Sequence, residues 1–564
     1  MRGDEHAEIS YKGQVLLRSV RALIRDKNWG TPDFIVKKVS ESPNQLEVEI
    51  TSEGFDAHFS GTVKFEVKNS TAEIQMSLTS GKDFSANRIG LNVLIPPALA
   101  GTDLLVHHSD QSQENSNLPL KISPHQPVFD ISALAWNQAG LDVTLEFSGD
   151  VFEMEDQRNW TDASYKIYSR PLSLPFPYSV AAGEQISQKL LITVDSEVAN
   201  SPTAEKNTEA KISLMPAGIF PAIQLGASSA PAVTGGYFET TALVAGFPVL
   251  VEVDLNTHNW KSALERAAEN LAGIDLRVIC DAGVTASSFN DLLDSIASLH
   301  ISRIAVFDSL LHVSTVETNQ LLKQLLEARG MNPKLIVGAR SHFTELNRNF
   351  SDLPEFRDGL TFSISPLFHA TNTEQLVESI AMQRLVASQA VEMAGGKEVH
   401  IGPITLRPRF NNVATEKPEI PDVSDLSIGY GAEWFGTNDQ RQQSPELAAW
   451  LVASAAATSV PGVHSLTYFE QWGPRGIESG DGITYPVFEA VKLLAEMTGR
   501  SFLSGGSPDG LIWALNFVSG EVNGAGSLLV VANLRGQATE VELEINGNSK
   551  VVNLNPYSWN RFST

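Results

Sequence analysis

The pattern of apolar and polar residues changes twice along the chain, which divides it into three regions. From residue 1 to about 215, segments such as LEVEITSEGF and LDVTLEFSG alternate apolar and polar residues, as half-buried antiparallel strands do. Clusters of Ser, Asn, Gly and Pro separate these segments. We therefore expect residues 1–216 to form an N-terminal β-sandwich-like domain.

The central region contains apolar, strand-like runs that alternate with segments of helical periodicity. Eight runs occur, at 221–229, 249–255, 276–282, 301–309, 334–341, 360–366, 399–406 and 463–470. Helical segments such as 260–273 and 373–396 lie between most of them, and several end at glycine. This pattern over residues 217–498 matches the size of a (β/α)8 TIM barrel. An open doubly wound sheet is the alternative, but no glycine-rich dinucleotide fingerprint supports it.

Strand patterns return at the end of the chain. LIWALNF, SLLVVANL and TEVELEING predict a small C-terminal β-sandwich domain over residues 499–564. The fold class expected is therefore multidomain α/β plus all-β. Before the last barrel helix, residues 411–445 form an unusually long connection, which is either a binding loop or lid, or a docked surface loop.

Charge and composition exclude several classes of partner. The chain has 66 acidic and 41 basic residues, a formal net charge of −25, which repels nucleic-acid phosphates and anionic lipids. There is no stretch of 18 apolar residues and no secretory h-region, so we expect a cytoplasmic protein without a membrane segment. The single cysteine, Cys280, lies in an apolar run and is expected to be buried, which leaves no disulfide framework.

Candidate chemistry follows from the barrel, because active sites of this fold lie at the carboxyl ends of the strands. The expected strand ends carry carboxylates, histidines, arginines and a tyrosine that suit acid–base hydrolysis: Glu252, Asp254, Asp281, Asp308, Arg340, His342, His369, Arg407, Arg409, Tyr468 and Glu470. Strict alternation would place Tyr468 and Glu470 on one face of their strand.

The densest polar cluster lies outside the barrel, in EMEDQRNWTDASYK at 153–166. It places ionisable groups around Asn159 and Trp160: Glu153, Glu155, Asp156, Arg158, Asp162 and Lys166. A structural knot of salt bridges at a domain junction is one interpretation. The other is a loop that faces the barrel mouth and shares a polar pocket with Glu470 and His369.

Several enzyme classes lack their motifs here. The chain has no G-x-S-x-G elbow, no Walker motif and no H-E-x-x-H zinc motif. His107 and His108 lie in a loop of the N-terminal region, where neighbouring side chains diverge, which favours a surface role. Retaining glycosidases of this fold need two carboxylates close together, but strand four ends VFDS and strand seven ends GPITL.

The run FEMEDQRNWTDASYKIYSRPLSLPFPYSVAAGEQISQ at 152–188 resembles the D-apionate lactonase family. So do SPLFHATNTEQLVESI, HIGPITLRPRF and HSLTYFEQWGPRGI, which follow in the same order. The resemblance implies a β-domain, a barrel and a small C-terminal β-domain. The activity that it implies is hydrolysis of D-apionolactone to D-apionate, a step of bacterial apiose catabolism.

Lactone opening needs a base that activates water and a donor for the carbonyl oxygen and the leaving alkoxide. From position and chemistry we expect catalytic roles for Glu470, Asp156, Asp308 and His369. The expected substrate-binding residues are Glu155, Arg158, Asn159, Trp160, Asp162, Lys166, Asp254, Arg340 and Tyr468. No cofactor or metal motif is present, although Glu155, Asp156 and Asp308 leave a divalent ion as an alternative.

The expected partner is a small sugar lactone, and the sequence leaves the oligomeric state open. Two other functions also stay open at this point. One is a barrel-type glycoside hydrolase acting on a plant-derived sugar, and the other is a non-catalytic carbohydrate-binding protein.

Overall fold

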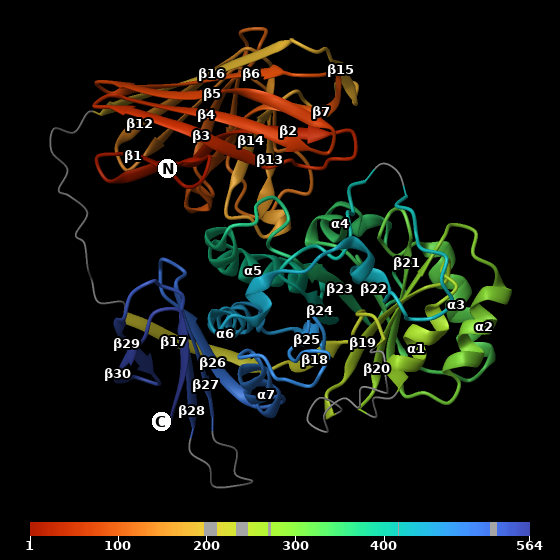
Figure 1. Ribbon diagram of the computed structural model, residues 1–564. Coiled ribbons are helices and arrows are strands. Elements are labelled where there is room, and N and C mark those ends of the chain that lie inside the picture. Colours follow the sequence, from red (N-terminus) through yellow and green to blue (C-terminus); the bar gives the residue numbers. More distant parts are fainter. Residues whose placement is uncertain (197–210, 233–245, 269–271, 415–416, 519–526, 564) are drawn as a thin grey trace. The chain divides into compact units, whose positions relative to one another are not determined.

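The computed structural model describes residues 1–196, 211–232, 246–268, 272–414, 417–518 and 527–563, which fall into two compact units (Figure 1). The N-terminal unit comprises Met1–Arg158, Ala163–Lys206 and Val413–Pro418. The barrel unit comprises Asn159–Asp162, Asn207–Asn412 and Glu419–Thr564. The short segment Asn159–Asp162 thus belongs to the barrel unit, although in sequence it lies within the N-terminal region.

Two sheets form the N-terminal unit. The first has the order β1 (His6–Tyr11), β2 (Gln14–Asp26), β7 (Phe84–Ile95), β14 (Tyr165–Ser169), β13 (Phe152–Asp156) and β10 (Val128–Ile131), with β15 (Tyr178–Val180) also paired to β7. The second has the order β3 (Phe34–Ser42), β4 (Gln45–Gly54), β5 (Ala57–Lys68), β6 (Thr71–Ser80), β16 (Gln185–Ser196), β12 (Leu141–Ser148), β11 (Ala133–Gln138), β8 (Asp103–His107) and β9 (Gln113–Asn117).

Alternation along these strands produces the core of the N-terminal unit. In β12, Leu141, Val143, Leu145 and Phe147 are buried, and the residues between them are partly or fully exposed. Apolar residues of both sheets join one buried cluster, so the two sheets enclose a common core. This arrangement confirms the sandwich-like fold expected from the sequence.

Eight parallel strands close the barrel, as the eight apolar runs predicted. Their bounds are β18 (Ala222–Gly226), β19 (Val249–Asp254), β20 (Ile274–Cys280), β21 (Ile301–Asp308), β22 (Lys334–Gly338), β23 (Gly359–Ile364), β24 (Glu398–Ile404) and β25 (Val463–Glu470). Because β18 pairs with both β19 and β25, the sheet is closed, which rules out the open doubly wound alternative.

Helices connect most of the barrel strands. Those described are α1 (Trp260–Ala268), α2 (Ala286–Ile296), α3 (Val316–Ala328), α4 (Phe343–Arg348), α5 (Thr373–Ala394), α6 (Glu446–Thr458) and α7 (Phe488–Glu496). Helix α5 begins where the Asn372 side chain accepts a hydrogen bond from the Gln375 amide, and it ends at Gly395, whose φ of 59° suits glycine. Residues 269–271 of the predicted helix at 260–273 lie outside the described residues.

A third sheet completes the barrel unit. Its order is β30 (Asn548–Leu554), β29 (Thr539–Ile545), β17 (Lys211–Ile219), β26 (Ser501–Gly506), β27 (Ile512–Phe517), β28 (Leu528–Asn533) and β31 (Ser558–Ser563). Strand β17 precedes the barrel in sequence and crosses the 216/217 boundary expected between the first two domains. The Ser504 hydroxyl donates to the Ala456 carbonyl of α6 at 3.1 Å, which joins this sheet to the barrel.

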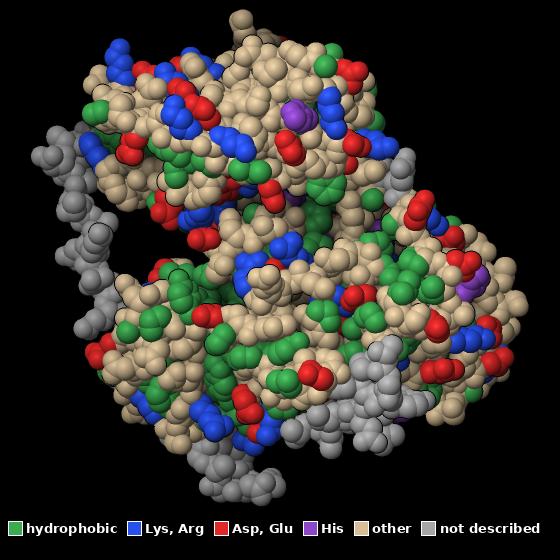
Figure 2. All heavy atoms as spheres, viewed as in Figure 1, with side chains coloured by type: hydrophobic (Ala, Val, Ile, Leu, Met, Phe, Trp, Pro, Cys, Tyr) green, Lys and Arg blue, Asp and Glu red, His purple; other side chains and the backbone are tan. Residues whose placement is uncertain are grey.

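The surface carries charges of both signs. Figure 2 shows Lys and Arg side chains mixed with Asp and Glu over the visible faces of both units. Each helix within the described part of the chain is too short or too polar to cross a membrane. Cys280 is buried, as expected, and burial raises the pKa of its thiol to about 12.

The barrel interior contains a buried ionic network in addition to apolar side chains such as Phe307 and Ile336. Asp275 of β20 is fully buried, and its carboxylate accepts from Arg277 Nη2 at 2.9 Å and from Arg303 Nε at 2.6 Å. Arg303 also donates to the Gln224 side chain at 2.6 Å. Burial alone would raise the pKa of Asp275, but Arg277 and Arg303 outweigh it and hold that pKa at about 2.

This network predicts a large effect of removing the Asp275 charge. Asp275→Asn keeps the volume but leaves two buried guanidinium groups without their carboxylate, so we expect a loss of about 3–5 kcal/mol in the free energy of unfolding. Urea denaturation followed by circular dichroism measures it.

Asp291→Asn is the matched control, because Asp291 pairs with Lys261 at 2.6 Å and both side chains are about half exposed. The control should change the unfolding free energy by less than about 1 kcal/mol. Equal effects of the two substitutions would contradict the prediction.

Candidate active site

The carboxyl ends of the barrel strands bring most of the predicted barrel residues to one rim. Asp254, Asp308 and Glu470 end β19, β21 and β25, and Arg340 and His369 follow β22 and β23. A parallel closed barrel has all these ends on the same side. The contacts of each side chain then decide which of them face a possible substrate.

Asp162 and His369 form a hydrogen-bonded pair within the barrel unit. His369 Nδ1 lies 2.9 Å from Asp162 Oδ2, and the Gln375 side chain donates to Asp162 Oδ1 at 2.7 Å. Both members are largely buried, with side-chain exposures of 11% for His369 and 5% for Asp162. A carboxylate on Nδ1 fixes the tautomer and orientation of an imidazole, so this is the geometry of an oriented general base.

Two aromatic rings, those of Trp160 and Phe368, pack against the His369 ring. Trp160 stacks on Phe368, with ring centroids 6.2 Å apart, and meets His369 edge-on at 5.2 Å. The Arg348 guanidinium lies over the Trp160 ring, and Asn159 Oδ1 accepts from the Asn347 side chain at 3.0 Å. Asn159, Trp160 and Asp162, which the sequence predicted as substrate-binding, therefore contact residues that follow β22 and β23.

A second cluster centres on Arg409, which follows β24. Its guanidinium donates to Glu252 of β19, to the Arg340 carbonyl, and to the Ser363 hydroxyl of β23 at 3.0 Å. Burial lowers the pKa of Arg409 to about 10, against the opposing effect of Glu470. Arg409 thus ties three strand ends together, and both of its terminal nitrogens are engaged.

Arg340 lies beside this cluster with its guanidinium held on two sides. Nε is 3.5 Å from Glu252 Oε1, and Cζ lies 3.9 Å from the centroid of the Phe410 ring. His312 packs on the same ring at 4.7 Å and has a left-handed φ of 58°. Burial, and then Arg340, lowers the pKa of His312 to about 3, which keeps this imidazole neutral.

The carboxylate of Glu470 is occupied by neighbouring groups. Oε1 accepts from the Ser229 hydroxyl at 2.6 Å and from Arg475 Nε at 3.0 Å, and Oε2 accepts from the Ser229 amide at 3.1 Å. Arg475 also pairs with Glu433 at 2.7 Å. Ser229 and Arg475 thus hold the Glu470 carboxylate in place at the rim, and its catalytic role stays a prediction from the sequence.

Tyr468 and Glu470 do not share a face, so that prediction was wrong. Phe469 has a left-handed φ of 57°, and two residues of β25 oppose one of β18 between the Thr467 and Glu470 pairings. The Tyr468 hydroxyl instead bonds Ser454 at 2.9 Å on helix α6, where the side chain is fully buried. Tyr468 packs between the barrel and a helix, away from the interior where a substrate would bind.

The Asp308 carboxylate is bonded to the backbone at the end of β21. Its Oδ1 accepts from the Leu310 and Leu311 amides, both at 2.8 Å, and so caps the turn that follows β21. Val306, two residues earlier on the same strand, packs in the core between the barrel strands and the helices. Residues two apart on a strand share a face, so the Asp308 side chain is expected on the helix-facing side of β21. Asp308 thus stabilises this turn, and its catalytic role stays a prediction from the sequence.

The remaining predicted residues belong to the N-terminal unit. Asp156 and Arg158 form a buried pair at 2.6 Å, in which Arg158 Nη2 also donates to the Pro119 carbonyl and Asp156 accepts from the Ser123 amide. Lys166 pairs with Glu155. Asp156 and Arg158 thus stabilise their own unit, and their catalytic and substrate-binding roles stay predictions from the sequence.

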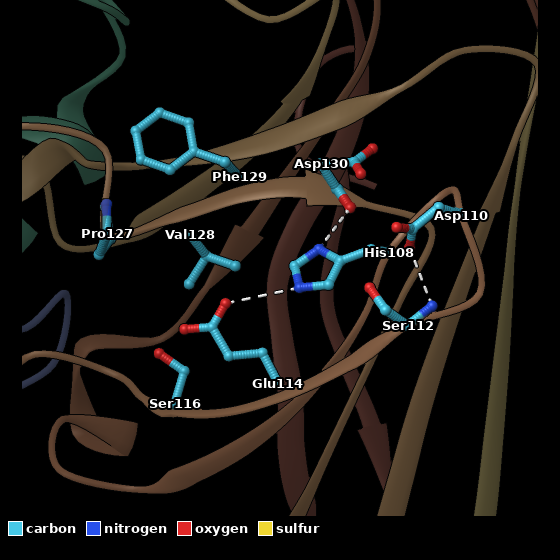
Figure 3. Close-up of a pocket in the computed structure, with 9 residues that line it drawn as sticks. All are labelled: His108, Asp110, Ser112, Glu114, Ser116, Pro127, Val128, Phe129 and Asp130. Carbon is cyan, nitrogen blue, oxygen red and sulfur yellow. Dashed lines mark hydrogen bonds and ion pairs between the residues drawn. The ribbon is translucent and has the colours of Figure 1, made fainter.

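The described residues enclose a small cavity at the rim and an open pocket elsewhere. The first, of about 10 Å³, has room for about one water molecule, and His342, Ser363 and Arg409 are among its walls. The second, of about 380 Å³, lies in the N-terminal unit between the β8–β9 hairpin and β10 (Figure 3). There the His108 ring contacts the Asp130 carbonyl at 3.1 Å and Glu114 at 3.4 Å, and His107 does not line it.

Sequence reasoning missed several residues of the rim. Phe410, His312, Ser363, Gln375 and Arg475 were not selected, although Phe410 lies in the RPRF run after β24. The sequence left open whether the long segment 411–445 is a binding loop or a docked surface loop. Its Leu426 and Tyr430 pack on Ala263 of α1, as in a docked loop. Residues 415–416 of this segment lie outside the described residues.

No group of three or more His, Cys, Asp or Glu in the described part of the chain is placed to hold a metal ion.

Comparison with solved structures gives weak overall similarity. SrfJ from Salmonella typhimurium matches with a TM-score of 0.39 and 11% identity, over 64% of this chain and 93% of that one. An endo-beta1,6-glucanase matches with a TM-score of 0.38 and 10% identity, over 64% and 96% of the two chains.

Sequence comparison is more informative. The D-apionate lactonase of Brucella anthropi is 26% identical, over 91% of this chain and 90% of the relative. Residues 1–197 match the N-terminal domain of D-apionate lactonase, and residues 238–499 match its TIM barrel domain. With both domains matched in order, the chain belongs to the D-apionate lactonase family.

Proposed function

We propose that this protein is a lactone hydrolase and that it opens D-apionolactone to D-apionate. The family supports the reaction class, an ester-bond hydrolysis, and the named relative supports the substrate. The observation that carries the proposal is the Asp162–His369 pair, which supplies an oriented imidazole at the rim where barrel enzymes act.

The proposed reaction uses His369 as general base. His369 Nε2, opposite the Nδ1 held by Asp162, takes a proton from water as the water oxygen bonds to the lactone carbonyl carbon. The carbonyl π electrons move to oxygen and form a tetrahedral oxyanion. When the oxyanion collapses, the ring C–O bond breaks and the leaving alkoxide takes the proton from His369. The product is the open hydroxy acid, which loses a proton to solvent.

Trp160 and the groups around it suit the remainder of such a substrate. Trp160 and Phe368 are stacked and border the His369 ring, so an apolar wall lies beside the proposed base. Burial and His369 lower the pKa of His342 to about 3, which keeps it a neutral hydrogen-bonding group. Neutral donors and acceptors beside an aromatic wall are the means by which proteins bind hydroxylated ligands.

The proposal predicts acid release from D-apionolactone above the spontaneous rate. A pH-stat assay with the purified full chain, run beside a buffer blank, measures it. An aryl glycoside in parallel tests the glycoside hydrolase alternative, and we expect no release of the aryl group. Turnover of the glycoside without turnover of the lactone would contradict the proposal.

The Asp162–His369 pair should act as one unit. We expect His369→Gln and Asp162→Asn each to lower kcat/KM by about 10²–10⁴-fold, the range for losing an oriented base. The double variant should lower kcat/KM by about as much as His369→Gln alone, because the two side chains act together as one base. Initial rates on D-apionolactone give the three values.

Asp422→Asn is the matched control, since Asp422 pairs with His258 at 2.6 Å while both side chains are largely exposed, at 84% and 74%. It should leave kcat/KM within about twofold, because an exposed pair contributes little. Normal kinetics in folded Asp162→Asn, together with a large fall in Tm, would assign the pair to structure instead.

A further inference from the structure

The guanidinium of Arg340 is held rigidly, while its two terminal nitrogens have no hydrogen-bond partner among the described residues. Glu252 approaches its Nε, the Phe410 ring lies against its flat face, and its side chain is only 13% exposed. Its backbone is fixed as well, because the Arg340 carbonyl accepts from Arg409 and its amide donates to the His312 carbonyl at 2.9 Å. A long side chain restrained at so many points has already lost its rotamer freedom before a ligand arrives.

The terminal nitrogens of Arg340 make no hydrogen bond to any described residue. This contrasts with the neighbouring Arg409, whose terminal nitrogens bond Glu252, the Arg340 carbonyl and Ser363. Two adjacent arginines thus have different tasks. Arg409 holds the strand ends, and Arg340 presents a pair of unused N–H donors.

Asp254, at the end of β19, also has an unused oxygen. Its Oδ1 accepts from the Asn256 amide at 3.0 Å and from the Asn256 side chain at 2.9 Å, while Oδ2 has no partner among the described residues. Arg340 and Asp254 influence each other electrostatically, yet no ion pair within 4.0 Å joins them. The unused donors of Arg340 and the unused acceptor of Asp254 are therefore both open to a ligand that carries both kinds of group.

We propose that Arg340 binds the carbonyl oxygen of the lactone and then the carboxylate of the product, while Asp254 accepts from a hydroxyl of the same molecule. The inference rests on the proposed function and adds to it the group that stabilises the oxyanion. A planar pair of N–H donors matches a carboxylate better than a lysine ammonium does, because it offers two parallel hydrogen bonds. The ligand class is a hydroxylated carboxylate, an aldonate, together with its lactone.

Binding of the product anion tests this assignment separately from turnover. Calorimetry gives the Kd of D-apionate and of a neutral alditol of the same carbon skeleton for the wild type, Arg340→Gln and Arg340→Lys. Arg340→Gln should weaken D-apionate binding by about 10- to 100-fold, as expected for losing a hydrogen bond to a charged group. Alditol binding should stay within about twofold, and kcat/KM for the lactone should fall by about 10²–10³-fold.

Arg340→Lys keeps the positive charge but loses the second donor, so its D-apionate affinity should lie between those of the other two proteins. Arg329→Gln is the control, because Arg329 ends α3 and bonds Asp294 and Asn290 of α2. Helices of a barrel run back toward the opposite rim, so this arginine should affect neither ligand.

The outcomes separate the two proposals. If the wild type opens the lactone while Arg340→Gln binds D-apionate as tightly as the wild type, the role of Arg340 is overturned and the proposed function stands. If the wild type neither opens the lactone nor binds D-apionate, both are overturned. Should Arg340→Gln fail to fold, unchanged D-apionate affinity and kcat/KM in folded Arg340→Lys overturn the role of Arg340.

Discussion

The geometry of the barrel rim depends on one buried guanidinium, that of Arg409. Its hydrogen bonds reach Glu252 on β19, the backbone after β22 and Ser363 on β23, so one side chain spans three strand ends. A buried cation is tolerated only where its donors are paired, and the loss of any partner would leave that charge unsatisfied. The position of Arg340, and through Glu252 the direction of its guanidinium, both follow from this requirement.

Much of the fold could be predicted because side-chain alternation and barrel closure are properties of whole segments. The run at 249–255 became β19 (Val249–Asp254), and the run at 463–470 became β25 with the same bounds. Predictions failed where one residue departs from the regular backbone. Phe469 adopts a left-handed φ at a bulge in β25, so Tyr468 and Glu470 do not share a face. This irregularity does not change the hydrophobic pattern that the sequence displays.

The candidate site was only partly predictable, because its contacts join residues far apart in the chain. The polar run at 153–166 was recognisable from its composition. Composition could not show that its residues are divided between the N-terminal unit and the barrel unit. Asp156 and Arg158 pair with each other inside the N-terminal unit, whereas Asp162 meets His369, 207 residues away, in the barrel unit. A buried charge needs a partner, and the sequence does not reveal whether that partner lies two residues away or two hundred.

Glu252 and Asp254 show how a single strand can provide both structure and chemistry. They are two residues apart on β19 and therefore share a face. Both oxygens of Glu252 engage arginines, Oε2 with Arg409 and Oε1 with Arg340, so this carboxylate is held as a counter-charge. Asp254 lies one step nearer the end of the strand, where burial raises its pKa and Arg340 partly offsets the rise. Glu252 thus completes the ionic network with the two arginines, whereas Asp254 keeps one oxygen available for a ligand.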